Sequence, residues 1–283
     1  MLGCLSGGRK PNFGLGWPGG RGYILPVMGG GISKTQWRRI KRLLHGRGRA
    51  ESGRLLVEGG RAVQAVLQRK IPPEQILVGP DATDFARDVL ESARTLGVPV
   101  ADLSSEQISE LSTTTHPQEL IALVAWLPQP ELPDTMPPLS LHLSGIRNPA
   151  NLGALLRTAA AFDVTVTCSP DCVDPTHPVA VRSGTASYFE STIVTNVPLN
   201  ALQKTAPEHD IISVAAHGGE DLSGFVWRDR TILVLGGEAE GATEPVHART
   251  TVTIPSQVES LNVAVAGGIL LWDVHQKGTL TSS

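Results

Sequence analysis

The stretch LSLHLSGIRNPANLGALLRTAAAF, residues 139–162, decides the fold of this chain. It begins with five residues in which apolar and polar side chains alternate, and this pattern predicts a strand over 139–143. After a polar turn, apolar residues recur at helical spacing, which predicts a helix over 151–162. A strand followed by a loop and a helix opens a βαβ unit, so we expect a parallel sheet covered by helices.

The same alternation continues to the end of the chain. It predicts strands over 164–168, 191–194, 211–214, 232–235 and 251–254, and helices over 179–187 and 261–275. Strands that alternate with helices in this way predict a mostly parallel, doubly wound α/β sheet.

The preceding residues predict a separate, smaller α/β unit. It contains apolar strands over 55–57, 75–78, 98–100 and 120–124, and helices over 58–69, over 85–95 and from Ser105 onward. Five prolines mark residues 128–138 as a linker, and residues 1–33 are rich in glycine and proline without periodicity. We therefore expect a disordered lead over 1–33, a first domain over 34–127, the linker, and a second domain over 139–283.

Charge is distributed unevenly along the chain. Residues 1–60 hold 11 Lys and Arg against two acids, whereas the remaining residues hold 13 basic and 25 acidic side chains. The run 34–49 carries seven basic residues and no acid, and its apolar residues fit a single helix. A solvated helix face is the alternative, but unmixed positive charge favours contact with an RNA backbone. The candidate contacts are Arg38, Arg39, Lys41 and Arg42.

Composition excludes several classes of protein. The chain is 41% hydrophobic and 18% charged, which is typical of a globular protein, and no apolar run reaches the length of a membrane span. Its three cysteines form no disulfide framework, and no signal peptide is recognised, so we expect a cytoplasmic protein without membrane contact. Cys168, Cys172 and His177 offer three metal ligands, but a structural zinc site needs four, so no metal is expected.

Polar or glycine-containing segments follow three of the predicted strands. They are Gly145–Gly153, Gly236–Glu238 and Pro255–Asn262. Because the carboxyl ends of parallel strands share one edge of a sheet, these segments are expected to line one binding site. Arg157 lies in an otherwise apolar helix and therefore needs an anionic partner, either a phosphate or an internal carboxylate such as Asp163 or Glu238.

Taken singly, the segments are ambiguous. Gly236-Gly237-Glu238 is compatible with a plain turn, and Ser260-Leu261-Asn262 with a helix N-cap, for which Ser260 is the expected capping residue. Together they resemble the three motifs of SpoU-type RNA 2'-O-ribose methyltransferases, the TrmH-like branch of the SPOUT class. The first resembles Asn-Pro-x-Asn-x-Gly-x-x-x-Arg-Thr-Ala, the second Gly-x-Glu-x-x-Gly, and the third Ile-Pro followed by Ser-Leu-Asn-Val-x-Val-Ala. Residues 178–183 resemble a fourth, weaker element, and residues 54–125 resemble the family's small substrate-binding domain.

The resemblance implies a fold, a reaction and a site. It implies a C-terminal trefoil knot, a homodimer, S-adenosylmethionine as cofactor, and methylation of a ribose 2'-hydroxyl, with rRNA of the 23S type favoured over tRNA. It matches Gly236, Ile254 and Leu261 to cofactor-binding residues. It matches five positions to the family's polar residues with catalytic or structural roles: Asn151, Arg157, Glu238, Ser260 and Asn262. It also makes Arg182 a candidate phosphate contact.

Two departures from the family pattern concern the cofactor loop and the fourth element. The span from Ile254 to Leu261 is two residues shorter than usual, and Val179 replaces the usual lysine. The alternatives are a tRNA 2'-O-methyltransferase and a non-catalytic RNA-binding or ribosome-assembly protein with a decayed site. An antibiotic-resistance enzyme would share the same motifs. A dinucleotide-dependent oxidoreductase is disfavoured because no Gly-x-Gly-x-x-Gly turn follows an early strand.

Overall fold

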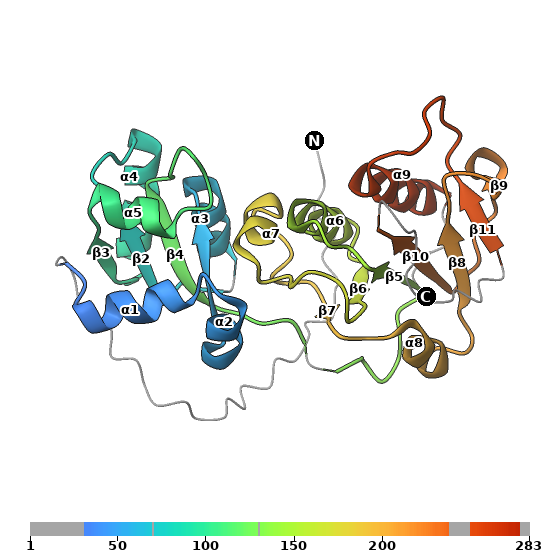
Figure 1. The fold of residues 1–283 in the computed structure, drawn as a ribbon, viewed down its shortest axis with the longest axis horizontal. Helices are drawn as coiled ribbons and strands as arrows, with labels where there is room; N and C mark the ends of the chain where they lie inside the picture. Colours follow the sequence, from blue (N-terminus) through green and yellow to red (C-terminus); the bar gives the residue numbers. More distant parts are fainter. Residues whose placement is uncertain (1–30, 70, 130, 238–249, 278–283) are drawn as a thin grey trace.

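The structure is a computed structural model that describes residues 31–69, 71–129, 131–237 and 250–277. It contains two sheets, each with its own helices, at opposite ends of an elongated molecule (Figure 1). The segment between strands β4 and β5 joins the two units. No helix in the described ranges is long and apolar enough to cross a bilayer.

The first unit is a four-stranded sheet in the order β1-β4-β2-β3. Its strands are β1 (Arg54–Glu58), β2 (Gln75–Val78), β3 (Val100–Asp102) and β4 (Leu120–Ala125), and its helices are α1 (Lys34–Arg42), α2 (Gly46–Ser52), α3 (Gly60–Gln68), α4 (Asp84–Thr95) and α5 (Ser105–Leu111). Strand β4 runs antiparallel to β1 and β2, while β2 and β3 are parallel.

Helices cover both faces of this sheet. Successive strand residues point to opposite faces, so Leu120 and Ala122 pack with α3 and α4, whereas Ile121 and Leu123 pack with α1 and α5. The continuous apolar run of β4 is buried along almost its whole length for this reason. Helix α1 thus buries one side in the core and presents its other side to solvent.

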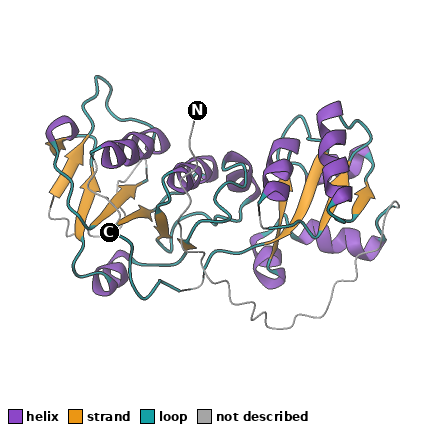
Figure 2. Cartoon of the chain, turned by 180° about the vertical axis from the view of Figure 1, so that it is seen from behind, coloured by secondary structure: helices purple, strands orange, loops and turns teal. Residues whose placement is uncertain are grey.

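The second unit is a seven-stranded sheet in the order β7-β6-β5-β10-β8-β11-β9, and all of these pairings are parallel. Its strands are β5 (Leu139–Ser144), β6 (Thr165–Cys168), β7 (Ile193–Val194), β8 (Asp210–Val214), β9 (Glu220–Asp221), β10 (Thr231–Gly236) and β11 (Thr250–Thr253). Its helices are α6 (Pro149–Ala161), α7 (Pro178–Ser183), α8 (Leu199–Thr205), the short 3₁₀ helix η1 (Leu222–Gly224) and α9 (Val263–Gln276). Helices α6 and α9 lie on one side of the sheet and α8 on the other, in the view of Figure 1 and from behind in Figure 2.

The predicted α/β class and the mostly parallel sheet are confirmed. The prediction of one helix over 34–49 is wrong, because α1 ends at Arg42 and α2 starts at Gly46. Ser33, which we placed in the lead, is the N-cap of α1, and the lead up to residue 30 lies outside the described residues. The short elements α8 and β9 were not predicted. The knot stays a prediction, because residues 238–249 of the connection from β10 to β11 lie outside the described ranges.

Candidate active site

The carboxyl ends of β5 and β10 meet at one edge of the large sheet. Gly236 is in register with Ser144, and the Gly237 amide donates a hydrogen bond to the Ser144 carbonyl over 3.1 Å. A Cβ atom on Gly237 would lie 2.6 Å from the carbonyl oxygen of Gly145, closer than real Cβ contacts come. The second glycine of the Gly-Gly-Glu segment is therefore required because the backbone of the first segment approaches it closely.

A cavity of about 550 Å³ opens beyond these strand ends. Its walls include the predicted residues Gly236, Ile254, Ser260 and Leu261, together with Val263 and Ala266 from the start of α9. The structure thus brings the three predicted cofactor-binding residues to one cavity. The walls are mostly apolar, and volumes of this order are typical of sites for small organic ligands.

Our sequence reasoning missed the contribution of β8 to this cavity. Residues 213–216, at and just after the end of β8, form part of the wall. Strand β8 lies between β10 and β11, so its carboxyl end faces the same edge. The strand over 211–214 was predicted, and the rule that groups carboxyl ends would have included the residues that follow it.

Two asparagines start the helices of the site. Asn148 is the N-cap of α6 and accepts hydrogen bonds from the Ala150 and Asn151 amides. Asn262 is the N-cap of α9 and accepts from the Ala264 and Val265 amides. The expectation that Ser260 caps the last helix is wrong. The predicted start of the helix over 151–162 at Asn151 is also wrong. In both cases the structure places the cap on the asparagine that reaches the free amides of the first turn.

The first and third segments are joined by their side chains. The Asn262 amide group donates to Asn151 Oδ1 over 3.1 Å. Close packing of α6 and α9 makes this possible, since a Cβ atom on Gly267 would lie 2.4 Å from Leu155 Cδ2. Two residues that are 111 positions apart in sequence therefore form one polar pair at the starts of two helices.

Arg157 lies further along α6 and is exposed. The internal ion pair with Asp163 that we considered is not found: within the part of the chain that the structure describes, Arg157 has no hydrogen-bond or ion-pair partner. Glu238, the other candidate partner and itself a predicted site residue, lies outside the described residues. The Arg157 guanidinium is thus presented to solvent, where a phosphate can reach it.

The fourth element forms α7 and packs tightly on α6. A Cβ atom on Gly153 would lie 2.2 Å from the Ala180 carbonyl oxygen, so the glycine of the first segment lets the two helices touch. Arg182 on α7 donates a hydrogen bond to Thr113 Oγ1 over 3.4 Å. Because Thr113 belongs to the first unit, Arg182 lies where the two units meet.

The predicted RNA contacts of α1 are exposed. Arg38, Arg39, Lys41 and Arg42 all face solvent, although Lys41 pairs with Glu110 over 2.6 Å and Arg42 pairs with Glu51. Such exposed ion pairs are weak and exchange readily for other anions.

The structure corrects the expectation for Arg49, which belongs to the same basic run. Its side chain is only 3% exposed and donates to Asp174 Oδ2 at 2.9 Å and to Thr176 Oγ1 at 2.8 Å. It also donates to the carbonyls of Leu43 and Leu44. Arg49 therefore holds the first unit to the loop before α7 and is not available to RNA.

The fold provides contacts for all three candidate metal ligands, Cys168, Cys172 and His177. A hydrogen bond with the Cys168 thiol lowers the pKa of Cys172 to about 7, although burial acts in the opposite direction. The same hydrogen bond, together with burial, raises the pKa of Cys168. His177 is the N-cap of α7, and burial lowers its pKa. Among the described residues, no group of three His, Cys, Asp or Glu side chains is arranged to hold a metal ion.

Two family models match the chain. Residues 138–272 match the SpoU rRNA Methylase family, and residues 34–122 match the MRM3-like substrate binding domain. The first match contains the three polar segments and the fourth element. The second runs from α1 to the first half of β4.

Individual relatives agree with these matches. The 23S rRNA (guanosine-2'-O-)-methyltransferase RlmB of Xylella fastidiosa is 30% identical over 68% of this chain and 84% of its own length. An uncharacterized tRNA/rRNA methyltransferase of Synechocystis is 31% identical, over 62% of this chain and 66% of that protein. The crystal structure of the SpoU methyltransferase AviRb from Streptomyces viridochromogenes, in complex with the cofactor AdoMet, has a TM-score of 0.72. It covers 87% of this chain and 98% of AviRb at 22% identity, so it supports the fold.

Proposed function

Because the chain belongs to the SpoU rRNA methylase family, we propose that it transfers a methyl group from S-adenosylmethionine to a ribose 2'-hydroxyl of ribosomal RNA. The observation that carries this proposal is the joined site: a cavity at the strand ends, the Asn151–Asn262 pair beside it, and an exposed arginine on the same helix as Asn151. The relatives named as 23S rRNA methyltransferases favour large-subunit rRNA over tRNA as the substrate.

The cavity fits S-adenosylmethionine. Its apolar walls suit an adenine ring, and Gly236 and Gly237 line it without side chains, so a ligand can approach the backbone there closely. We assign Gly236, Ile254 and Leu261 to cofactor binding. When bound, the cofactor supplies the methyl group from its sulfonium centre. The wall residues exclude water, which would otherwise compete with the ribose oxygen.

Arg157 is the residue to which we assign the RNA side of the reaction. A guanidinium has planar, forked donors that match a phosphate and an adjacent oxygen, so Arg157 can hold the target nucleotide with its 2'-oxygen in place. A guanidinium does not readily release its own proton, so the hydroxyl proton passes to a phosphate oxygen or to water.

Asn151 and Asn262 act as the positioning pair. Each contributes to the start of a helix, and their hydrogen bond fixes the relative position of the two starts. Ser260 shapes the loop that forms the cavity wall, because it lies two residues before the cap. Glu238 belongs to the proposed catalytic set on the basis of its position in the second motif.

Residues 34–127 are the proposed RNA-binding domain, joined by 128–138 to the methyltransferase domain of 139–283. The exposed cations Arg38, Arg39, Lys41 and Arg42 lie on α1 of the first domain, and Arg182 lies where the domains meet. These positions form two candidate contacts for one RNA, in line with the substrate-binding family model over residues 34–122.

We also propose a homodimer. On α9, Val265, Ile269 and Trp272 are 53%, 37% and 55% exposed and follow one another at helical spacing, which gives an uncovered apolar stripe. A second copy of the chain would cover it. We expect Trp272→Glu to convert a dimer into a monomer in light-scattering measurements, and an unchanged mass would refute this surface.

The trefoil knot and a cytoplasmic location, where rRNA is available, complete the proposal.

The decisive experiment is incubation of the protein with total RNA and methyl-labelled S-adenosylmethionine, followed by nucleoside mass spectrometry. A labelled 2'-O-methylated nucleoside from rRNA supports the proposal, and mapping that nucleoside identifies the position. Absence of label together with absence of calorimetric heat on addition of the cofactor would instead support the decayed, RNA-binding alternative.

A further inference from the structure

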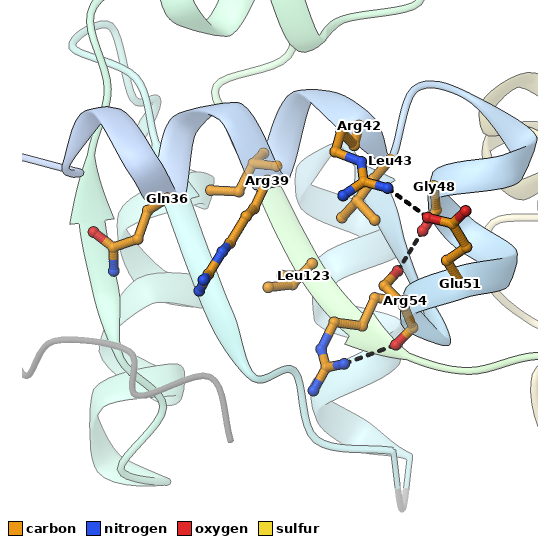
Figure 3. Close-up of a pocket in the computed structure, with 10 residues that line it drawn as sticks. Gln36, Arg39, Arg42, Leu43, Gly48, Glu51, Arg54 and Leu123 are labelled. Atoms are coloured by element: carbon orange, nitrogen blue, oxygen red, sulfur yellow. Dashed lines mark hydrogen bonds and ion pairs between the residues drawn. The ribbon is translucent and has the colours of Figure 1, made fainter. Parts of the chain in front are cut away.

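A second cavity lies far from the strand ends, on the first unit. It has a volume of about 170 Å³ and lies between α1, α2 and the strands β1 and β4. Its floor is apolar and is formed by Ile40, Leu43 and Leu123. Arg39, Arg42 and Arg54 surround it (Figure 3). It is thus a small pocket with an apolar floor and a rim of three arginines and Glu51, on the unit that the proposed function assigns to RNA.

The shape of the pocket is set by the close contact of α1 and α2. A Cβ atom on Gly48 would lie 2.0 Å from the Arg42 carbonyl oxygen, so only glycine lets α2 press on the end of α1. Arg49, one residue later, fixes α2 by its buried bonds to the Leu43 and Leu44 carbonyls. The pocket is therefore built from the native packing of two helices and is not a chance gap between mobile side chains.

Two of the rim arginines pair with carboxylates, and the pair of Arg54 is the less exposed of the two. Arg54 makes a forked contact with Glu74, with distances of 2.6 and 2.8 Å, and Arg42 pairs with Glu51. Arg39 is exposed and extends from α1 beside Leu123 (Figure 3). Planar guanidinium groups around an apolar floor offer the surfaces on which nucleobases stack.

Charge identifies the class of ligand. Helix α1 carries Lys34, Arg38, Arg39, Lys41 and Arg42 and no acid, so the mouth of the pocket lies against a run of positive charge that suits a phosphate backbone. A paired base cannot leave its helix without cost, whereas an unpaired base can enter an apolar pocket while its backbone stays outside. We propose that this pocket binds an unpaired nucleobase of the substrate RNA, with Arg39 stacking on the base. This inference rests on the proposed function.

The test compares two neighbouring arginines in the full-length protein. Arg39→Gln and Arg38→Gln each remove one charge from the exposed side of α1, but only Arg39 lines the pocket. Binding is measured with a fluorescent single-stranded RNA of mixed sequence, about 20 nucleotides long to exceed the footprint of one binding site, and with the same strand annealed to its complement. We expect Arg39→Gln to weaken binding of the single strand about tenfold more than Arg38→Gln does, since base stacking is lost only in the former. On the duplex, the two variants should lose affinity equally.

A second variant fills the pocket without changing charge. Ser52 lines it, and its hydroxyl bonds only to carbonyls of its own helix among the described residues, at Gly48 and Arg49, so Ser52→Met can be accommodated. We expect it to weaken single-strand binding about tenfold and to leave duplex binding unchanged. Thermal unfolding of each variant verifies that it folds.

The outcomes separate this inference from the proposed function. Equal losses for Arg39→Gln and Arg38→Gln, or a Ser52→Met variant with native affinity, would overturn the pocket even if the wild-type protein methylates rRNA. That result would leave α1 as a phosphate contact only, or the pocket as a site for a ligand other than RNA. Failure of the wild-type protein to bind cofactor or to label any RNA would count against the proposed function instead.

Discussion

The proposed cofactor cavity differs from the exposed cations, which are Arg157 and the basic residues of α1, in how the protein holds it. The cavity is formed by backbone at strand ends, by glycines in tight contact and by a helix start fixed by an asparagine. The cations are long, exposed side chains, and the ion pairs of Lys41 with Glu110 and of Arg42 with Glu51 are solvent-accessible. A small ligand thus meets a preformed site, whereas RNA has to order the side chains that bind it. Substitutions in the cavity should therefore reduce both stability and cofactor affinity, whereas substitutions of the exposed cations should reduce RNA binding or activity and leave stability unchanged.

Arg157→Ala should have the largest effect. Removing the donors that hold the target nucleotide should slow methyl transfer by at least about 10²- to 10³-fold, the range found when a positioned donor is lost. Because Arg157 is exposed and does not line the described walls of the cavity, stability should change by no more than about 0.5 kcal/mol. Single-turnover rates, cofactor calorimetry and thermal unfolding measure the three quantities.

Arg157→Lys is the matched control for this variant. It keeps the charge but loses the planar fork, so it should recover only part of the rate. A near-normal rate for Arg157→Ala would remove this residue from the mechanism. A large loss of cofactor affinity would show that the exposed cation and the cavity are not independent.

Arg49→Met should have the next largest effect, which is a loss of folding stability. The substitution breaks a charged contact and leaves the carbonyls of Leu43 and Leu44 without their buried donor. Since Asp174 is partly exposed, we expect a loss of about 2–3 kcal/mol, below the range for a fully buried pair. Arg38→Met is the control, because Arg38 is exposed in the same basic run and should leave the unfolding temperature unchanged. If both variants melt alike, Arg49 does not hold the two units together.

Arg49 also shows what the sequence could not reveal. Its burial depends on Asp174 and Thr176, which are 125 and 127 residues away, so local charge density could only group it with the basic run that we expected to contact RNA. Most of the strands were predictable because apolar runs such as 76–78 are buried on both faces and carry their own signal. The strand-end rule likewise located the cavity.

The helix starts were partly predictable from local residues. Asn148 precedes a proline at the first helical position, a recognised start signal that our prediction of a helix from Asn151 did not use. Ser260 and Asn262 are both good capping residues, and only the structure decides between them. The contact between Asn151 and Asn262 needs the packing of α6 on α9, so no local pattern contains it.

Gly237→Ala tests the cavity side of the comparison. The added methyl group would meet the Gly145 carbonyl oxygen at 2.6 Å, so one of two backbone segments of the site has to move. Overpacking of this kind costs about 1–3 kcal/mol, and we expect weaker cofactor binding, by about tenfold, together with a lower unfolding temperature. Gly224→Ala is the control, because a Cβ atom there meets no atom of the described ranges within 4 Å. Loss of affinity without loss of stability would mean that the contact between the two segments is not part of the folded core.

Asn262→Ala should have the smallest effect, and a comparison with Asn148→Ala isolates its cause. Both asparagines accept two amide hydrogen bonds at a helix start, so each substitution should cost about 1 kcal/mol of stability as a lost cap. Asn262 also donates to Asn151, so its removal should cost a further 0.5–1.5 kcal/mol, roughly the value of one hydrogen bond. A double-mutant cycle of Asn151→Ala and Asn262→Ala measures this term directly as the coupling energy in chemical unfolding. A coupling energy near zero would mean that the two helix starts are placed by packing at Gly267 alone, and the polar pair would then act on the RNA rather than on the fold.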